Sequence, residues 1–262
     1  SQTACSVGTY QPSAAQSSCI EAEAGYYVDS TASISQTECS LGTYQPSTGQ
    51  SSCIDADAGY HVPSTASATQ TACSTGTYQP NTGQNSCIES SVGYYVPTTA
   101  ATSQVACSPG AYQPDTGQAS CLDSDAGYYV DSTAANSQTA CVAGTYQPSI
   151  GQTSCIDADA GYYVDSPASS SQAPCAVGGY QPSIGQSSCY DADPGHYVDS
   201  SAAIAQTACS VGTYNPDSGS SSPTACMNAD AGYFVAESGS NSQTACLAGT
   251  YQSSTGQPSC LD

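Results

Sequence analysis

Residues 39–72 read CSLGTYQPSTGQSSCIDADAGYHVPSTASATQTA, and this stretch recurs along the chain with few changes. Each copy opens with a cysteine and carries a second one at a fixed spacing, as Cys39 and Cys53 do, except that Cys209 and Cys226 are farther apart. A fixed period of about 34 residues is typical of a stack of small units that each contact mainly their neighbours. We expect the end of a preceding repeat at 1–4, seven repeats at 5–38, 39–72, 73–106, 107–140, 141–174, 175–208 and 209–245, and a partial repeat at 246–262.

The composition lacks the material for a large apolar core. The 262 residues include no tryptophan, one phenylalanine and one methionine, against 20 tyrosines and 16 cysteines. A chain with so little core material depends on covalent links for its stability. An even number of regularly spaced cysteines indicates disulfides and an oxidising compartment. The sequence therefore predicts an extracellular or cell-surface protein.

The charge balance excludes several classes of partner. The chain has no lysine or arginine and 21 acidic residues, which gives a formal net charge of −21. No cation is available to neutralise nucleic-acid phosphates or to form a polybasic membrane patch. The sequence also lacks an apolar run long enough to span a bilayer. We therefore expect no nucleic acid and no membrane contact from this segment.

Each repeat consists of two related halves of equal length, which in the second repeat are 39–55 and 56–72. When the halves are aligned on their first glycines, Cys39 falls on Ala56 and Cys53 falls on Gln70. The joint absence of both cysteines from the second halves is expected if they are bonded to each other. The insertion before Cys226 lies inside the same loop, where extra length costs little closure entropy. The predicted disulfides are Cys5–Cys19, Cys39–Cys53, Cys73–Cys87, Cys107–Cys121, Cys141–Cys155, Cys175–Cys189, Cys209–Cys226 and Cys246–Cys260.

The local sequence favours short strands and turns. Strand-like pieces read Gly-Thr-Tyr-Gln-Pro and Gly-Tyr-Tyr-Val-Asp, and turn-like pieces read Pro-Ser-Thr-Gly-Gln and Asp-Ser-Thr-Ala-Ser. No stretch shows helical periodicity. The predicted fold class is small disulfide-rich all-β tandem repeats, an elongated, solenoid-like stack of short hairpins with almost no helix.

Tyrosines recur at one position of the first half in every copy, and aromatic residues mostly occupy the matching position of the second half. Aromatic side chains at a fixed period can pack from one unit onto the next. The first-half tyrosines are Tyr10, Tyr44, Tyr78, Tyr112, Tyr146, Tyr180, Tyr214 and Tyr251.

The first halves share the pattern Cys-x-x-Gly-Thr-Tyr-x-Pro-x-x-Gly-x-x-x-Cys. In the second repeat it is carried by Cys39, Gly42, Thr43, Tyr44, Pro46, Gly49 and Cys53. The pattern resembles the cysteine-rich modules of tumour-necrosis-factor-receptor and ephrin-receptor type ectodomains. The resemblance implies an elongated, disulfide-linked rod at a cell surface. The near-identity of the copies is also similar to giant repetitive extracellular proteins of aquatic microbes.

Acidic pairs before the glycine of the second halves are the candidate metal site. Carboxylates close in sequence suit Ca²⁺, which takes six to eight oxygen ligands. The alternative is a solvated acidic face, because the full spacing of a calcium loop is missing. No other cofactor is expected. The candidate residues are Asp55, Asp57, Asp123, Asp125, Asp157, Asp159, Asp191 and Asp193.

Hydroxyl clusters in the turns are candidate O-glycan sites. Exposed segments rich in serine and threonine with interspersed proline are typical carriers of O-glycans. The alternative is that these residues only maintain solubility. The candidate residues are Ser30, Thr31, Ser47, Thr48, Ser132 and Thr133.

Catalytic groups are scarce. The only histidines are His61 and His196, and each replaces a tyrosine of the Gly-Tyr-Tyr motif. With the thiols expected to be oxidised and no lysine present, no nucleophile–base pair recurs along the array. We therefore expect that the chain is not an enzyme.

The uniformity of the copies favours a structural role. The leading hypothesis is a structural extracellular protein, a segment of a longer array that forms a fibril or surface filament, because self-assembly needs one face presented many times. Its partner would then be itself, as neighbouring repeats or identical chains. The alternative is a stalk or adhesin spacer that presents a ligand-binding domain outside this segment. The start of the chain, Ser1-Gln2-Thr3-Ala4-Cys5, matches residues 137–141 inside the array, which indicates a longer array.

Non-reducing peptide mapping tests the disulfide pairing. Cleavage after Tyr44 separates Cys39 from Cys53 in sequence, so their peptides remain joined only through a disulfide. We expect this joined product, and each loop of roughly 15 residues is expected to contribute about 3 kcal/mol. A product that joins Cys53 to Cys73 instead would contradict the division into halves.

Overall fold

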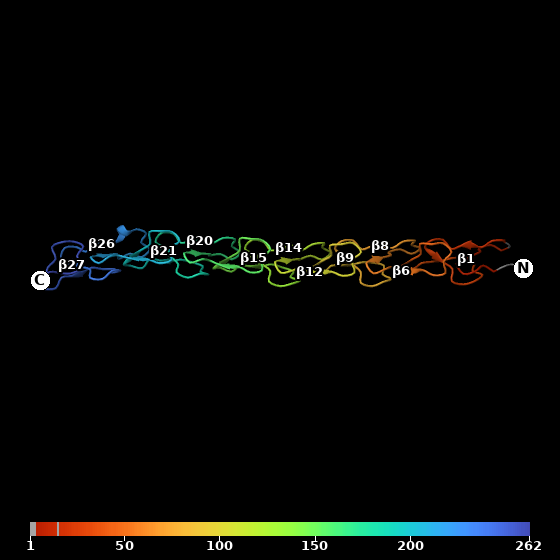
Figure 1. Ribbon diagram of the computed structural model, residues 1–262, viewed down its shortest axis with the longest axis horizontal. Coiled ribbons are helices and arrows are strands. Elements are labelled where there is room, and N and C mark those ends of the chain that lie inside the picture. Colours follow the sequence, from red (N-terminus) through yellow and green to blue (C-terminus); the bar gives the residue numbers. More distant parts are fainter. Residues whose placement is uncertain (1–3, 15) are drawn as a thin grey trace. The chain divides into compact units, whose positions relative to one another are not determined.

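The structure is a computed structural model that describes residues 4–14 and 16–262, and its regular elements are short antiparallel hairpins (Figure 1). Each hairpin pairs two strands of two residues. In the second repeat Tyr44 lies opposite Ile54 in the first half, and His61 lies opposite Thr71 in the second half. The predicted fold class, small disulfide-rich all-β repeats, is confirmed.

The halves that contain a disulfide, called stapled halves below, form one hairpin each. These hairpins are β1 (Thr9–Tyr10) with β2 (Ile20–Glu21), β5 (Thr43–Tyr44) with β6 (Ile54–Asp55), β9 (Thr77–Tyr78) with β10 (Ile88–Glu89), β13 (Ala111–Tyr112) with β14 (Leu122–Asp123), β17 (Thr145–Tyr146) with β18 (Ile156–Asp157), β21 (Gly179–Tyr180) with β22 (Tyr190–Asp191), β25 (Thr213–Tyr214) with β26 (Met227–Asn228), and a single bridge between Tyr251 and Leu261.

The halves without cysteines, called unstapled halves below, form the same hairpin. These hairpins are β3 (Tyr26–Tyr27) with β4 (Thr37–Glu38), β7 (Tyr60–His61) with β8 (Thr71–Ala72), β11 (Tyr94–Tyr95) with β12 (Val105–Ala106), β15 (Tyr128–Tyr129) with β16 (Thr139–Ala140), β19 (Tyr162–Tyr163) with β20 (Ala173–Pro174), β23 (His196–Tyr197) with β24 (Thr207–Ala208), and β27 (Tyr233–Phe234) with β28 (Thr244–Ala245).

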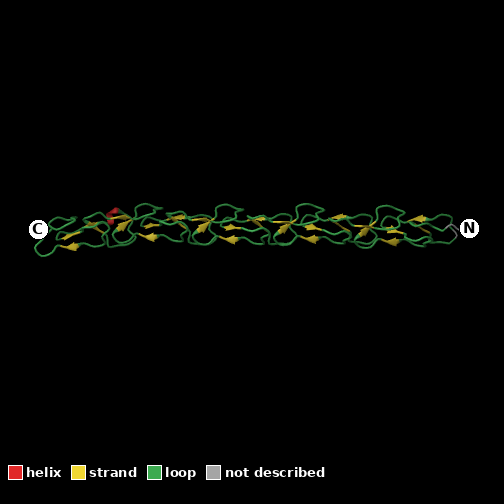
Figure 2. Cartoon of the chain, turned by 60° about the horizontal axis from the view of Figure 1, so that its bottom comes forward, coloured by secondary structure: helices red, strands yellow, loops and turns green. Residues whose placement is uncertain are grey.

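The chain forms two compact units. One contains the described residues up to Asp123 together with Ser132–Ser137, and the other contains Ser124–Asp131 and Gln138–Asp262. Within the described residues the only helical segment is the 3₁₀ turn η1 (Pro223–Ala225), coloured red in Figure 2. Among these residues no helix has the length and apolar character needed to cross a membrane.

The turn η1 lies inside the longest disulfide loop, at the insertion. Ser222 caps it, since its side-chain oxygen accepts a hydrogen bond from the amide of Thr224 at 3.2 Å. The insertion is thus absorbed between Cys209 and Cys226, and the hairpin of β25 and β26 retains its pairing.

Backbone hydrogen bonds join each half to the next one. The amide of Gly42 donates to the carbonyl of Val62 at 3.0 Å, and the amide of Ala66 donates back to the carbonyl of Cys39 at 2.9 Å. A third bond runs from the amide of Gln45 to the carbonyl of Ser67 at 3.0 Å. Bonds of these three types recur in both compact units. Because they use backbone groups, the contacts between halves tolerate changes in the side chains.

The core is narrow and contains small side chains. Cys39, Ala56 and Val62 are fully buried. Gln45 is also buried, and its amide nitrogen donates to the carbonyl of Ser52 at 2.8 Å. No buried side-chain nitrogen or oxygen in the described part of the chain lacks a hydrogen-bond partner. Satisfied amides therefore fill positions that larger apolar side chains occupy in an ordinary domain.

The tyrosines do not form a ring-on-ring ladder between halves. Among the described residues the one contact between aromatic rings joins Tyr180 and Tyr190, at 5.9 Å, and these are cross-strand partners in a single hairpin. At one aromatic position of an unstapled half the neighbour is the next disulfide, since His61 lies 3.2 Å from the sulfur of Cys87. The predicted ring-on-ring packing from one unit onto the next is therefore not seen in the described residues, and His61 contacts sulfur instead.

The first glycine of most halves allows a close approach of the backbone. Gly42 has a φ of 82°, and a Cβ there would lie 2.1 Å from the carbonyl oxygen of Gly83. Gly49 also has a positive φ, but a Cβ there would lie 3.4 Å from the nearest atom, in the flexible side chain of Glu21. The matching residue of the next half is Ala66, with a φ of 53°.

Alanine substitutions at these two glycines test the role of the close approach. Gly42→Ala is expected to destabilise the array by more than about 3 kcal/mol, because the new Cβ collides with a backbone carbonyl. Gly49→Ala is the matched control and is expected to cost about 1 kcal/mol, because only the left-handed backbone is penalised. Chemical denaturation followed by circular dichroism measures both. Equal losses of stability would contradict the steric argument.

Candidate functional site

All eight disulfides join the pairs named from the sequence. Their Cα–Cα distances are between 5.5 and 5.9 Å, and the described part of the chain contains no free cysteine. In the second repeat Cys39 is fully buried and Cys53 is half-buried. The stapled loops from the first to the seventh repeat are thus closed with one buried cysteine and one nearer the surface.

An exposed apolar side chain follows the second cysteine of every stapled half. Each is between 43% and 57% exposed, although single exposed apolar residues are otherwise ordinary on protein surfaces. The residues are Ile20, Ile54, Ile88, Leu122, Ile156, Tyr190, Met227 and Leu261.

Each of these residues lies opposite the first-half tyrosine of the same hairpin. Tyr44 lies opposite Ile54, and Tyr78 lies opposite Ile88. Side chains directly opposite one another in an antiparallel pair project from the same face. Every stapled half therefore presents an aromatic and an apolar side chain together, and we call this the Tyr–apolar pair.

The unstapled halves present a different pair. The residue opposite their aromatic side chain is usually threonine. The residues at this position are Thr37, Thr71, Val105, Thr139, Ala173, Thr207 and Thr244. The Tyr–apolar pair thus recurs in every stapled half, and in the unstapled halves only Tyr95 with Val105 and Tyr163 with Ala173 resemble it. The predicted site residues do not include this pair, although an apolar residue directly after each second cysteine is its signal in the sequence.

The acid that ends the stapled hairpin faces the tip of a later stapled loop in several repeats. Thr48 donates a hydrogen bond from its hydroxyl to the carboxylate of Glu21 at 2.9 Å. Thr116 binds Glu89 in the same way at 3.0 Å. Asp55 lies at the matching place, because a Cβ on Gly83 would be 3.4 Å from its carboxyl carbon.

The second acid is bound by the glutamine that replaces the second cysteine. Gln70 accepts a hydrogen bond from the amide of Asp57 at 2.7 Å and donates one to its carboxylate at 2.6 Å. This two-bond contact, called the Gln–acid clamp, closes the unstapled loop where a disulfide closes the stapled one. The other clamps join Glu23 to Gln36, Asp125 to Gln138, Asp159 to Gln172, Asp193 to Gln206 and Asp230 to Gln243.

The two acids of a pair therefore have separate partners. Of the residues that the structure describes, the one group of three metal-ligating side chains with ligand atoms within 4.8 Å is His61 with Cys73 and Cys87, and those cysteines form a disulfide. The described acids do not gather in threes by this measure. Calcium binding at Asp55, Asp57 and their equivalents stays a prediction.

The candidate O-glycan residues are all exposed and lie in turns. Ser30 donates to the carboxylate of Asp29 at 3.1 Å, and Thr48 donates to Glu21 as described above. Their positions give a glycosyltransferase access, and O-glycosylation stays a prediction.

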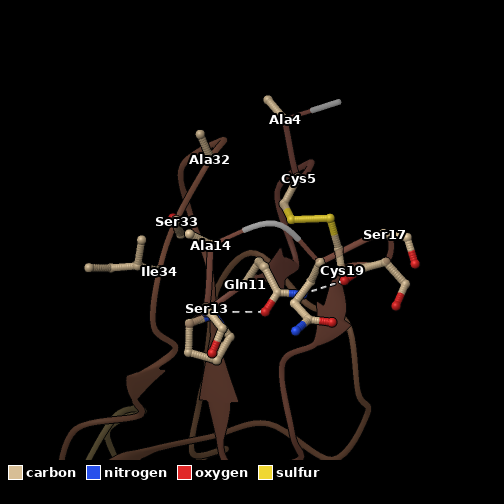
Figure 3. A pocket seen from close by; sticks show the side chains of 13 residues that line it. Ala4, Cys5, Gln11, Ser13, Ala14, Ser17, Cys19, Ala32, Ser33 and Ile34 are labelled. Carbon is tan, nitrogen blue, oxygen red and sulfur yellow. Dashed lines mark hydrogen bonds between the residues drawn. A yellow bond between two sulfur atoms is a disulfide. The ribbon is translucent and has the colours of Figure 1, made fainter. Parts of the chain in front are cut away.

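A hollow of about 1250 Å³ opens beside the disulfide of Cys5 and Cys19 (Figure 3). Gln11 lies against it from the stapled loop, and Ser33 and Ile34 line it from the following loop. The described residues that line it include no carboxylate and no imidazole, so they offer no side chain for acid–base catalysis.

The Gln–acid clamp can be tested by substitution. Gln70→Ala is expected to lower the free energy of local opening of its loop by about 1–2 kcal/mol, because two hydrogen bonds to Asp57 are lost. Gln50→Ala is the matched control, since Gln50 donates only to the carbonyl of Thr48 and is exposed. Its expected effect is below about 0.5 kcal/mol. Amide hydrogen exchange at Asp57 measures the difference.

A double substitution tests whether a disulfide can replace the Gln–acid clamp in an unstapled half. Ala56→Cys combined with Gln70→Cys is expected to form a disulfide. A disulfide that closes a loop of this length contributes about 3 kcal/mol, so the double variant is expected to recover at least the stability that Gln70→Ala removes. Persistent free thiols in this variant would show that the unstapled hairpin does not reproduce the stapled geometry.

Comparisons with known proteins agree with the repeat architecture. A family model described as tyrosine-protein kinase ephrin type A/B receptor-like matches residues 3–39 and 127–175. The comparison with curated proteins found no match. The matched stretches include the disulfides Cys5–Cys19 and Cys141–Cys155. The resemblance inferred from the sequence is therefore confirmed, and the chain is similar in its repeats to the cysteine-rich modules of ephrin-type receptors.

Proposed function

We propose that this chain is a segment of a structural extracellular protein that associates with copies of itself into a fibril or surface filament. The observation that carries the proposal is the Tyr–apolar pair, which recurs in every stapled half with its apolar member about half exposed. The proposal includes no catalytic role. Its partner is the same repeat, in neighbouring or identical chains.

The Tyr–apolar pair can form a stable interface only because it is repeated along the chain. Burying the exposed part of one such side chain is worth on the order of 1 kcal/mol, which is too little for a stable contact. When two arrays align, several pairs are buried together and the contacts reinforce one another as in other multivalent interactions. A ligand that does not share the spacing of the repeats would contact one pair at a time, and the other pairs would add little to its binding free energy.

Charge sets the conditions for this association. Each apolar residue precedes an acidic or amide side chain, as Ile54 precedes Asp55 and Met227 precedes Asn228. Two copies with a net charge of −21 repel each other at low ionic strength. At about 0.15 M salt the screening length falls to roughly 8 Å, so the repulsion becomes short-ranged. The proposed assembly therefore suits a saline extracellular medium.

The extracellular location is supported by the disulfides and by the similarity to receptor ectodomain modules. O-glycans on the exposed turn hydroxyls, such as Ser47 and Ser132, are part of the proposal. They lie in turns rather than in the Tyr–apolar pair, so glycans there leave the apolar side chains free.

Self-association is tested with two matched variants of the full chain. The first replaces Ile54, Ile88, Leu122 and Ile156 with serine. The control replaces Ile34, Ile150, Ile184 and Ile204, which are 58–74% exposed and lie outside the Tyr–apolar pairs. Both lose four large aliphatic side chains, but only the first loses the proposed interface.

Sedimentation velocity at about 10 mM and about 0.5 M NaCl measures the outcome, with electron microscopy of the same samples. The wild type and the control are expected to associate at the higher salt, and the first variant at least tenfold more weakly. A chelator is expected to leave the assembly intact, and disassembly would favour the calcium prediction. Monomeric wild type at both salt concentrations would contradict the proposal and favour the spacer role.

A further inference from the structure

One disulfide has a neighbour that the others lack. His61, on β7, places Nδ1 at 3.2 Å from the sulfur of Cys87, and its ligand nitrogen and both sulfurs of the Cys73–Cys87 disulfide lie within 4.8 Å of one another. His61 precedes Cys87 by 26 residues, so the contact joins an unstapled half to the stapled half that follows it.

The matching position of the other unstapled halves holds no imidazole. The residues there are Tyr27, Tyr95, Tyr129, Tyr163, Tyr197 and Phe234. The second histidine, His196, occupies the preceding position, and its Nδ1 lies 3.4 Å from the carbonyl oxygen of Pro194. Among the described residues the imidazole–disulfide contact therefore occurs only between His61 of the second repeat and the disulfide of the third repeat.

Exposure does not distinguish this disulfide from its interior equivalents. Cys73 is fully buried and Cys87 is half-buried, and the same holds for Cys107 and Cys121. A thiolate from solution therefore has access to the second sulfur in both. Any difference in their reactivity has to come from the neighbouring side chain.

We propose that Cys73–Cys87 is a thiol-exchange site, at which a small thiol becomes attached to Cys87. The incoming thiolate attacks the sulfur of Cys87, one S–S bond forms and the bond to Cys73 breaks. Cys73 keeps the electron pair as a thiolate, and the proton of the incoming thiol goes to solvent or to the imidazole. No external oxidant is needed, because one disulfide is exchanged for another.

His61 accelerates this step by accepting the proton of the incoming thiol. Its Nδ1 lies 3.2 Å from the sulfur of Cys87, which is the sulfur that is attacked, so the imidazole is close to the incoming thiol. A neutral imidazole has one unprotonated ring nitrogen that can accept a proton, and the rate of disulfide exchange depends on the thiolate fraction of the attacking thiol. The tyrosine or phenylalanine at this position of the other unstapled halves offers no such base, so the equivalent disulfides lack this assistance.

The full chain is treated with a limiting concentration of glutathione as the probe thiol, and samples are quenched with a maleimide over time. Cleavage after tyrosine separates the two cysteines of each loop, so mass spectrometry gives a rate for each disulfide. Cys73–Cys87 is expected to react on the order of tenfold faster than Cys107–Cys121, because the imidazole raises the thiolate fraction of the thiol beside it. Equal rates for these two disulfides would overturn the proposal.

Three variants isolate the imidazole. His61→Tyr restores the residue found in other repeats and is expected to slow Cys73–Cys87 to the rate of its equivalents. Tyr95→His places an imidazole at the matching position before Cys121. It is expected to raise the exchange rate of Cys107–Cys121 to about that of Cys73–Cys87 in the wild type. His196→Tyr is the control and is expected to change neither rate. An unchanged Cys73–Cys87 rate in His61→Tyr would also refute the proposal.

Discussion

The close approach of a carbonyl oxygen to the first glycine of a half, which recurs from Gly8 to Gly212, is the constraint on which the fold depends. A Cβ at Gly25 would lie 2.1 Å from the carbonyl oxygen of Ala66, so no other residue fits there without moving the backbone. The same glycine donates its amide to the carbonyl of Gln45, in the next half. One residue thus contacts each of the next two halves, and its position fixes their spacing. A core made of alanine, valine and cysteine then suffices, because the backbone supplies most of the contacts between halves.

Two chemically different closures produce the same hairpin. The stapled loop uses a disulfide, which mainly limits the unfolded chain and is worth about 3 kcal/mol for a loop of this length. The unstapled loop uses the Gln–acid clamp, which holds the folded loop by hydrogen bonds worth about 1 kcal/mol each. Since both closures fit the same register, the repeat can alternate them without altering the stack. The Tyr–apolar pair occurs in the more strongly closed half, where an exposed apolar side chain is held in a fixed position.

The sequence predicted the period, the hairpins and the cysteine pairs, because these follow from spacing. The joint replacement of Cys39 and Cys53 by Ala56 and Gln70 was enough to infer the loops. The sequence did not reveal that Gln70 binds Asp57. That contact depends on the register of the hairpin, and a polar residue in a turn ordinarily faces water. For the same reason the acids were interpreted as a candidate calcium site. Ile54 taken alone did not indicate an interface, because single exposed apolar residues are common on protein surfaces. Its role becomes apparent only from its cross-strand position opposite Tyr44.

The contacts between halves also determine what thiol exchange at the Cys73–Cys87 disulfide would do to the array. Each half is bonded through the backbone to its neighbours, so its disulfide closes its own loop and does not link it to another half. In a stack with nearest-neighbour contacts, loss of one closure changes the local opening free energy and leaves distant repeats unaffected. Exchange at Cys87 would therefore loosen one loop while the Tyr–apolar pairs of the other repeats keep their positions. A covalent attachment point can coexist with self-association for this reason, since the two depend on different parts of the repeat.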